Sequence, residues 1–229
     1  MNGPYYQTVI ASLDLFFIFL SYLRVRSEAS ENKKNESVQM LSAALLFLTL
    51  YMGFTLIADI SYFFNPLGVK ILHNFIATVL IFITMGLLIK IPASIYVPKV
   101  KNFIPWLTAF YGLIIGAINL NFGKIPTSQM GVVYLNMPDW VVAMNLILGS
   151  IMLLFTFLFF LDGALDSKNK YSRKRYFIFA ISTLLIFVSI LYWVPNYLII
   201  IPTTTLATFG YALMCFGIYL KPPESNKTY

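Results

Sequence analysis

Residues 140–175 read WVVAMNLILGSIMLLFTFLFFLDGALDSKNKYSRKR, and this stretch decides the class of the fold. Its first part, 140–162, is apolar over the roughly 20 residues that a helix needs to cross a bilayer. Its last part, 168–175, carries five basic residues. An apolar helix followed by a short basic loop is typical of a membrane span that ends on the cytoplasmic side.

The composition of the whole chain supports this interpretation. Of its 229 residues, 59% are hydrophobic and 11% are charged, whereas soluble domains are about 25% charged. The mean hydropathy is +0.78. The single cysteine, Cys215, excludes an intrachain disulfide and a cysteine-based metal cluster. The sequence therefore predicts an integral membrane protein.

Seven segments have the length and apolarity of a membrane span. They cover about 6–23, 38–63, 68–90, 103–121, 140–162, 176–194 and 198–220. The last two are separated only by VPNY, around Pro195. We therefore expect an all-α integral membrane protein in which residues 1–229 form a single domain, a bundle of seven transmembrane helices.

Charge predicts the orientation of this bundle. If the N-terminus lies outside, fourteen of the 16 basic residues fall in the inner loops and the C-terminal tail, and only Lys70 and Lys124 lie outside. Positive charge in short loops marks the cytoplasmic side. The sequence thus predicts an outside N-terminus and a cytoplasmic C-terminus, and the net charge of +7 reflects topology rather than nucleic-acid binding.

Two features of the loops are compatible with further organisation. The outer segment 121–140 contains Gly, Pro and the alternating piece MGVVYL, so it could form a small hairpin or lid, or serve as an ordinary connector. Loop lengths also fit an internal repeat of three helices, one linker helix and three helices, which is known in some transporters.

Three ionisable residues interrupt the apolar helices: Asp14, Asp59 and His73. A charge at the bilayer centre costs at least about 2.5–3.5 kcal/mol, so such residues face the bundle interior and are candidates for function. The helix directions place all three in the outer half of the membrane, together with Asn145 and Thr204.

Helical spacing predicts that these polar residues face one another. Tyr51, Thr55, Asp59 and Tyr62 share one helix face, and Asp14, His73, Asn145 and Thr204 each lie on a face of small and polar residues. We expect an outward-opening polar cavity. Its candidate ligand-binding residues are Asp14, Asp59, His73, Asn145, Thr204 and Tyr62. A carboxylate beside His73 would make the imidazole a candidate pH-responsive group; alternatively, each acid fixes helix register through hydrogen bonds.

The helix segments predicted to lie in the inner half of the membrane contain few polar residues. Between Phe75 and Ile89 the only polar side chains are Thr78 and Thr84, whose hydroxyls can bond to their own helix. The sequence therefore predicts a dry, packed inner half.

Several chemistries are absent from the pattern. Residues 198–220 hold no lysine for a retinal Schiff base, and one histidine does not indicate a haem pair. Asp14, Asp59 and His73 match no metal-site spacing. Ser12 and Ser61 are close in sequence to the two aspartates but point to different helix faces from them, so no serine nucleophile stands beside a base. We therefore expect no enzyme activity, no metal, no cofactor and no nucleic-acid partner.

The last third of the chain, from WVVAMNLILG to MCFGIYL, is similar to the end of the seven-helix sensor regions that precede bacterial and archaeal histidine kinases. The shared features are a long fifth helix, the basic inner loop SRKRY, an apolar sixth helix, a tight turn and a seventh helix that begins near a proline. No kinase part is present in this sequence. The size and helix spacing also resemble small seven-helix sugar transporters, but the Pro-Gln dipeptide and the first-helix prolines of that family are missing.

The resemblance implies a non-enzymatic sensor or receptor-like module of the cell membrane that passes its signal to a protein partner. That partner would lie in the membrane or on its cytoplasmic face, with membrane lipids around the bundle and a small ligand on the outer side. The alternatives are a transporter of small solutes or ions, and an accessory subunit of a larger membrane complex. A transporter needs polar groups accessible from both sides, which the predicted inner half lacks.

Overall fold

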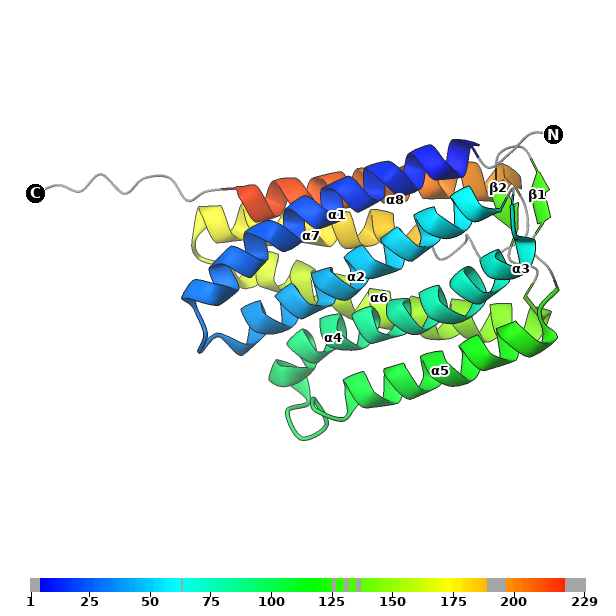
Figure 1. Ribbon diagram of the computed structural model, residues 1–229. Helices are drawn as coiled ribbons and strands as arrows, with labels where there is room; N and C mark the ends of the chain where they lie inside the picture. Colours follow the sequence, from blue (N-terminus) through cyan, green and yellow to red (C-terminus); the bar gives the residue numbers. More distant parts are fainter. Residues whose placement is uncertain are drawn as a thin grey trace, which may run out of the picture.

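Long helices run back and forth between the two ends of one bundle (Figure 1). The computed structural model describes residues 5–62, 64–124, 127–129, 132–134, 137–188 and 197–220. The helices are α1 (Tyr5–Glu31), α2 (Glu36–Ser61), α3 (Pro66–Val69), α4 (Thr78–Tyr96), α5 (Ile104–Phe122), α6 (Asp139–Asp166), α7 (Lys170–Val188) and α8 (Tyr197–Tyr219), with the π-helical segment η1 (Lys70–Ala77) between α3 and α4.

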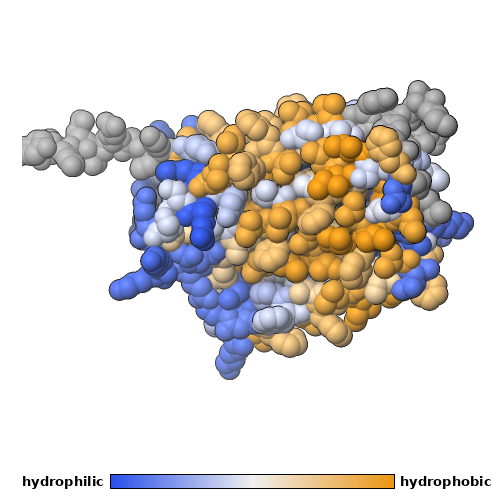
Figure 2. Space-filling view, viewed as in Figure 1, coloured by the Kyte–Doolittle hydropathy of each residue, from blue (hydrophilic) through white to orange (hydrophobic). Residues whose placement is uncertain are grey.

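The two ends of the bundle differ in charge. The loops 32–35, 97–103 and 167–169 meet at one end, here called the basic end, where twelve of the basic residues in the described part of the chain gather. The opposite end, here called the hairpin end, holds the α2–α3 turn and the strands β1 (Thr127–Gln129) and β2 (Val132–Tyr134). Figure 2 shows an apolar band around the middle of the bundle and hydrophilic residues concentrated at the basic end.

Within the described residues, six helices are long and apolar enough to cross a membrane: α1, α2, the composite third helix from Leu67 to Tyr96, α5, α6 and α8. This indicates a multi-pass membrane protein. The described part of α7 does not meet the same measure, because it begins with four basic residues in its first six and ends at Val188. That α7 is a seventh span therefore stays a prediction, whereas the all-helical fold is confirmed and is compatible with a membrane bundle.

The third span is a composite of three pieces. Pro66 starts α3 at the first helical position, and Oδ1 of Asn65 accepts a hydrogen bond from the Gly68 amide at 2.9 Å. The π-helical segment η1 follows before α4 resumes the α-helical pattern. π-helical turns are rare and frequent at functional sites. This one carries His73, which the sequence analysis had placed on an ordinary helix.

Several helices extend farther toward the basic end than the hydropathy predicted. α1 continues to Glu31, α4 to Tyr96 and α6 to Asp166, and α7 begins at Lys170. The added turns of α1 and α7 are rich in Glu, Lys and Arg, which are good helix formers but not apolar. Hydropathy marks only the part of a helix that lies in hydrocarbon, so it misses turns that continue into water.

Six of the helices form a closed ring. Contacts join α1 to α2, α2 to α4, α4 to α6, α6 to α7, α7 to α8 and α8 to α1. The remaining helix, α5, packs on the outside of the ring against α4 and η1. This order is compatible with a parallel repeat of three helices, one linker and three helices, with α5 as the linker.

Tyrosines hold the two seams between the halves of the ring. At the α1–α8 seam the Tyr6 hydroxyl donates to the carbonyl of Ile201 at 2.8 Å. At the α4–α6 seam the Tyr96 hydroxyl donates to Oδ2 of Asp162 at 2.6 Å. The first hydrogen bond lies at the hairpin end and the second at the basic end. Each of the two helix pairs is therefore joined by a tyrosine hydrogen bond at one of its ends.

Glycines allow α5 to approach α4 closely. A Cβ on Gly86 would lie 2.0 Å from Oγ1 of Thr108, and a Cβ on Gly112 would lie 2.9 Å from Cβ of Phe82. Gly112 and Gly116 form the small-xxx-small spacing that lets membrane helices pack backbone to backbone. This signal was present in the sequence and explains why α5 is attached to the ring through α4.

Replacing Gly86 by alanine should lower the free energy of unfolding by about 1–3 kcal/mol, the usual cost of overpacking. The added Cβ collides with Oγ1 of Thr108 and with the Pro105 backbone, at 2.0 and 2.9 Å. Gly53→Ala is the matched control, because no atom lies within 4 Å of a Cβ there. SDS titration of the purified protein measures both, and equal stability of the two variants would contradict the packing.

The strands β1 and β2 form a small hairpin, which was one of the alternatives for the segment 121–140. β1 and β2 pair antiparallel, with Ser128 opposite Val133. β2 contacts α1 and α8. The hairpin therefore lies over the α1–α8 side of the bundle, and its role as a lid stays a prediction.

Candidate ligand-binding cavity

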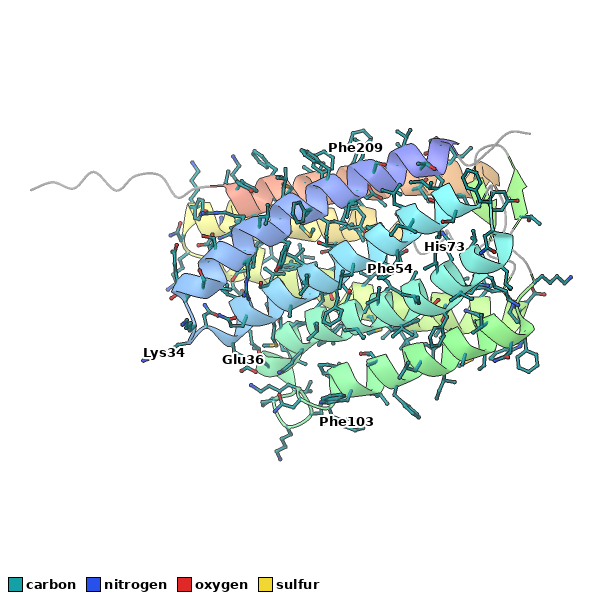
Figure 3. All side chains as sticks on the ribbon, in the orientation of Figure 1. Lys34, Glu36, Phe54, His73, Phe103 and Phe209 are labelled. Atoms are coloured by element: carbon teal, nitrogen blue, oxygen red, sulfur yellow. The ribbon has the colours of Figure 1, made fainter. Side chains whose placement is uncertain are left out.

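Asp59 and His73 form a buried pair at the hairpin end. Asp59 is in the last turns of α2 and His73 is in η1, and Nε2 of His73 lies 3.2 Å from Oδ1 of Asp59. Asp59 is 0% exposed and His73 is 4% exposed. The other carboxyl oxygen, Oδ2, has no hydrogen-bond partner among the described residues. The pair joins α2 to the π-helical segment, where Figure 3 places His73 near the hairpin end.

Asp14 is buried without a cationic partner. It projects from α1 with 5% of its surface exposed, and its Oδ1 atom makes no hydrogen bond within the described part of the chain. Thr208 of α8 lies in hydrogen-bonding range of its carboxyl group. No lysine, arginine or histidine pairs with it among the described residues. An unpaired buried carboxyl is costly, so a proton, water or cation is needed to complete this site.

A cavity of about 540 Å³ lies inside the ring of six helices. Each of α1, α2, α4, α6, α7 and α8 contributes lining residues, and α5 contributes none. Along α2 the lining extends from Ser37 to Thr55, which is about 27 Å at the rise of an α-helix. The cavity is therefore elongated along the bundle axis, and its volume falls within the range of about 300–1,000 Å³ typical of small-molecule sites.

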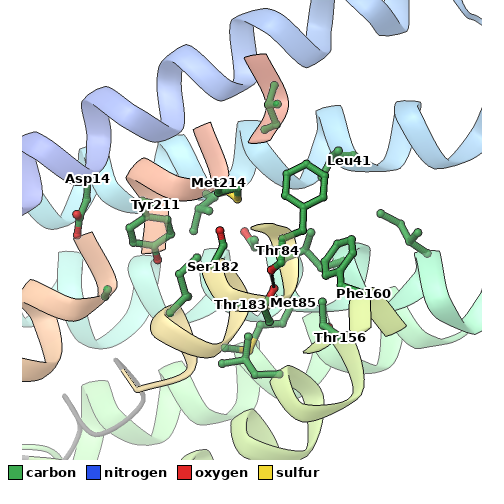
Figure 4. A pocket seen from close by; sticks show the side chains of 18 of the residues that line it. Asp14, Leu41, Thr84, Met85, Thr156, Phe160, Ser182, Thr183, Tyr211 and Met214 are labelled. Atoms are coloured by element: carbon green, nitrogen blue, oxygen red, sulfur yellow. Dashed lines mark hydrogen bonds between the residues drawn. The ribbon is translucent and has the colours of Figure 1, made fainter. Parts of the chain in front are cut away.

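Polar residues gather at the hairpin end of the cavity. They are Gln7, Asp14, Tyr51, Thr55, His73 and Thr204. Figure 4 shows Asp14 beside Tyr211, with Met214, Ser182 and Thr84 farther along the cavity. A ligand at this end would meet one carboxyl group and several neutral hydrogen-bonding groups.

The middle of the cavity is lined mainly by apolar side chains, among them Met52, Ile81, Met85 and Met214. Its hydroxyls already have partners: Thr84 donates to the Leu80 carbonyl at 2.9 Å and Thr156 to the Met152 carbonyl at 3.0 Å. Such back-bonded hydroxyls do not require a ligand. The middle section therefore suits the apolar body of a small molecule.

A second set of polar residues lines the cavity at the basic end. This set includes Asn35, Ser37, Tyr171, Ser172 and Arg175. Nε of Arg175 donates to the carbonyl of Gly217 at 3.1 Å, and the guanidinium lies 5.6 Å from the centre of the Phe179 ring. The cavity thus has a carboxyl group near one end and a guanidinium near the other.

The structure brings together some of the predicted site residues but not all. Asp14, His73 and Thr204 line the cavity. Asp59 lies behind His73 and reaches the cavity only through it. The prediction of one shared cavity is wrong for Asn145 and Tyr62. Asn145 accepts a hydrogen bond from Tyr111 of α5 at 3.3 Å, and Tyr62 packs against Ala58 and Val69.

The predicted packed inner half is also wrong. The cavity continues past Thr84 and Met85 to Pro92 and Ile95 of α4 and to Arg175 of α7. The prediction failed because an apolar run shows which residues avoid water, not whether their side chains fill the space between helices.

Four residues that were not among the predicted candidates also line the cavity: Tyr51, Thr55, Tyr211 and Arg175. Tyr51 and Thr55 lay on the predicted polar face of Asp59, whereas Arg175 was interpreted only as a topology signal.

The described residues hold no group of three or more His, Cys, Asp or Glu side chains that could bind a metal ion. Comparisons with protein-family models, with curated proteins and with solved structures found no match. The functional interpretation therefore depends on the cavity and its residues.

Proposed function

We propose that this chain is a non-enzymatic, receptor-like module of the cell membrane that binds a small, largely apolar ligand inside its helical ring. The observation that carries the proposal is the cavity of about 540 Å³ that reaches the buried Asp14, whose Oδ1 lacks a partner among the described residues. In this proposal Asp14 and His73 contact the ligand, and Asp59 positions the His73 ring.

The proposal includes an orientation, with the hairpin end outside and the basic end in the cytoplasm. The concentration of basic residues at one end supports it. A ligand would then meet the Asp14 side of the cavity first. The similarity to kinase sensor regions supports a protein partner on the membrane or cytoplasmic side, which would receive the signal.

Single-cysteine labelling tests the orientation. In a Cys215→Ala background, Ser128→Cys on β1 should react with an impermeant maleimide added outside intact cells. Ser167→Cys in the α6–α7 loop should react only after the cells are opened. The reverse pattern would place the basic end outside and contradict the proposed side of ligand entry.

Native mass spectrometry of the purified protein tests the binding function. We expect the wild type to retain a small molecule and the Asp14→Asn variant to retain less of it, because Oδ1 of this carboxyl group lacks a hydrogen-bond partner among the described residues. Asp139→Asn is the control, since Asp139 is an exposed residue of α6 that does not line the cavity. Retention of no molecule by the wild type would overturn the binding proposal, whereas equal retention by all three proteins would remove Asp14 from the proposed ligand contacts.

A transporter is the second candidate, and two observations favour it. The cavity carries polar residues at both ends, and the ring has the helix order of a three-plus-one-plus-three repeat. Transport and binding differ in one result: proteoliposomes of a transporter accumulate the retained molecule in a saturable, time-dependent manner. We expect binding without accumulation.

A further inference from the structure

The two buried aspartates of the bundle differ in their partners. Asp59 has His73 at 3.2 Å, so a cationic or hydrogen-bonding partner is built into the protein. Asp14 is equally enclosed, yet no cationic side chain pairs with it in the described part of the chain. A carboxyl group that faces a cavity and lacks a protein cation is the arrangement expected where a ligand supplies the charge.

The surroundings of Asp14 decide which kind of cation fits. Thr208 lies in hydrogen-bonding range of its carboxyl group, and the cavity near it is lined by Ala11, Tyr51, Ala207 and Tyr211. Ca²⁺ requires several oxygen ligands, usually from more than one carboxylate, and the described residues hold no group of three or more His, Cys, Asp or Glu side chains. Tyrosine rings and apolar side chains favour an organic ammonium, because aromatic faces attract cations and alkyl groups fill the remaining space.

The far end of the cavity orients such a ligand. Arg175 lies on the basic-end lining, and it repels a cation and favours the opposite end for the charged group. Between the two ends lie Met52, Met85 and Met214, flexible apolar side chains that adapt to an irregular body. A molecule with one ammonium group and one apolar body therefore fits the cavity in one orientation, with the ammonium group at the Asp14 end.

We propose that the ligand of this cavity is a hydrophobic amine, whose ammonium group pairs with Asp14 beside Tyr51 and Tyr211 and whose apolar body extends toward the basic end. This inference rests on the proposed ligand-binding function and names its ligand class. It also assigns Asp14 as the residue that selects the charge of the ligand. His73, with Asp59 behind it, forms the neighbouring wall of the same end.

Three probes of similar shape test the inference: 4-butylbenzylammonium, 4-butylbenzyl alcohol and 4-butylbenzoate. Binding to the purified full chain in nanodiscs is measured by calorimetry. We expect the ammonium to bind at least about 10-fold more tightly than the alcohol, because a charge-assisted hydrogen bond is stronger than a neutral one. The benzoate should bind weakest. Asp14→Asn should remove the advantage of the ammonium, and Asp139→Asn should preserve it.

Two further measurements distinguish a failure of the amine assignment from a failure of the proposed binding function. Equal binding of ammonium and alcohol, or no effect of Asp14→Asn, would overturn the amine assignment while leaving cavity binding intact. If a bulky substitution inside the cavity leaves the binding of all three probes unchanged, the proposed binding function itself fails. Stabilisation of the wild type by Na⁺ over choline in the absence of amine, lost in Asp14→Asn, would assign the site to an inorganic cation and overturn the proposal.

Discussion

Replacing His73 by leucine should lower the free energy of unfolding by about 3 kcal/mol, among the larger effects expected in this bundle. The substitution leaves Asp59 fully buried and removes the hydrogen bond to its Oδ1, while Oδ2 already lacks a partner among the described residues. An unsatisfied carboxyl group in a membrane interior has no water to replace the lost contact. Unfolding in SDS, followed by circular dichroism, measures the loss.

The partner substitutions make this prediction specific. Asp59→Asn retains an oxygen that can accept from His73, so it should cost less than His73→Leu. The double variant Asp59→Leu/His73→Leu removes both buried polar groups and should be more stable than His73→Leu alone. If the double variant is instead destabilised by the sum of the two single leucine substitutions, the pair is not energetically coupled and the geometry has been misinterpreted.

Ala207→Trp should weaken the binding of 4-butylbenzylammonium by at least about 100-fold, because the indole occupies the space that the ligand needs. Ala207 is on α8, is 3% exposed and lines the cavity beside the apolar cluster of Met52 and Tyr211. The substitution fills existing space, so the protein should still fold. Calorimetry with the probe measures the effect, and thermal unfolding checks the fold.

The matched control is Phe209→Trp on the same helix. Phe209 is 61% exposed and lies on the outer surface of the bundle (Figure 3). It should bind the probe like the wild type. Unchanged binding in Ala207→Trp, or an equal loss in Phe209→Trp, would show that the probe binds outside the ring.

The helical membrane class and the approximate helix positions were predictable from sequence because hydrocarbon imposes a simple rule. A helix must remain mostly apolar for the thickness of the bilayer, and segments such as 140–162 follow that rule with few polar side chains. The rule stops at the membrane surface. The continuation of α1 to Glu31 and the early start of α7 at Lys170 were therefore not predicted.

Helical spacing was sufficient to predict those site residues that lie on interior faces of their helices. Asp14, His73 and Thr204 were assigned to interior faces, and all three line the cavity. The spacing could not decide which interior face belonged to which interface. Asn145 is interior, but it faces Tyr111 of α5 rather than the cavity. Only the ring order, with α5 outside, determines that difference.

The cavity itself was not predictable, for a physical reason. Apolar residues such as Leu88 and Leu153 have the same hydropathy whether they fill a core or line an open space. The position of Arg175 illustrates the same limit. Its charge correctly predicted that it lies at the basic end, yet nothing in the local sequence indicated that it also borders a cavity.

The most direct test of the central claim locates a ligand inside the ring. A crystal grown with 4-bromobenzylammonium and measured at the bromine absorption edge gives an anomalous peak wherever the probe binds. The account predicts a peak within the cavity, with the ammonium directed toward Asp14 and the bromine toward Met85 and Met214. A peak on the outer face of α5 or against the lipid-facing side of α8, with none inside the ring, would contradict it.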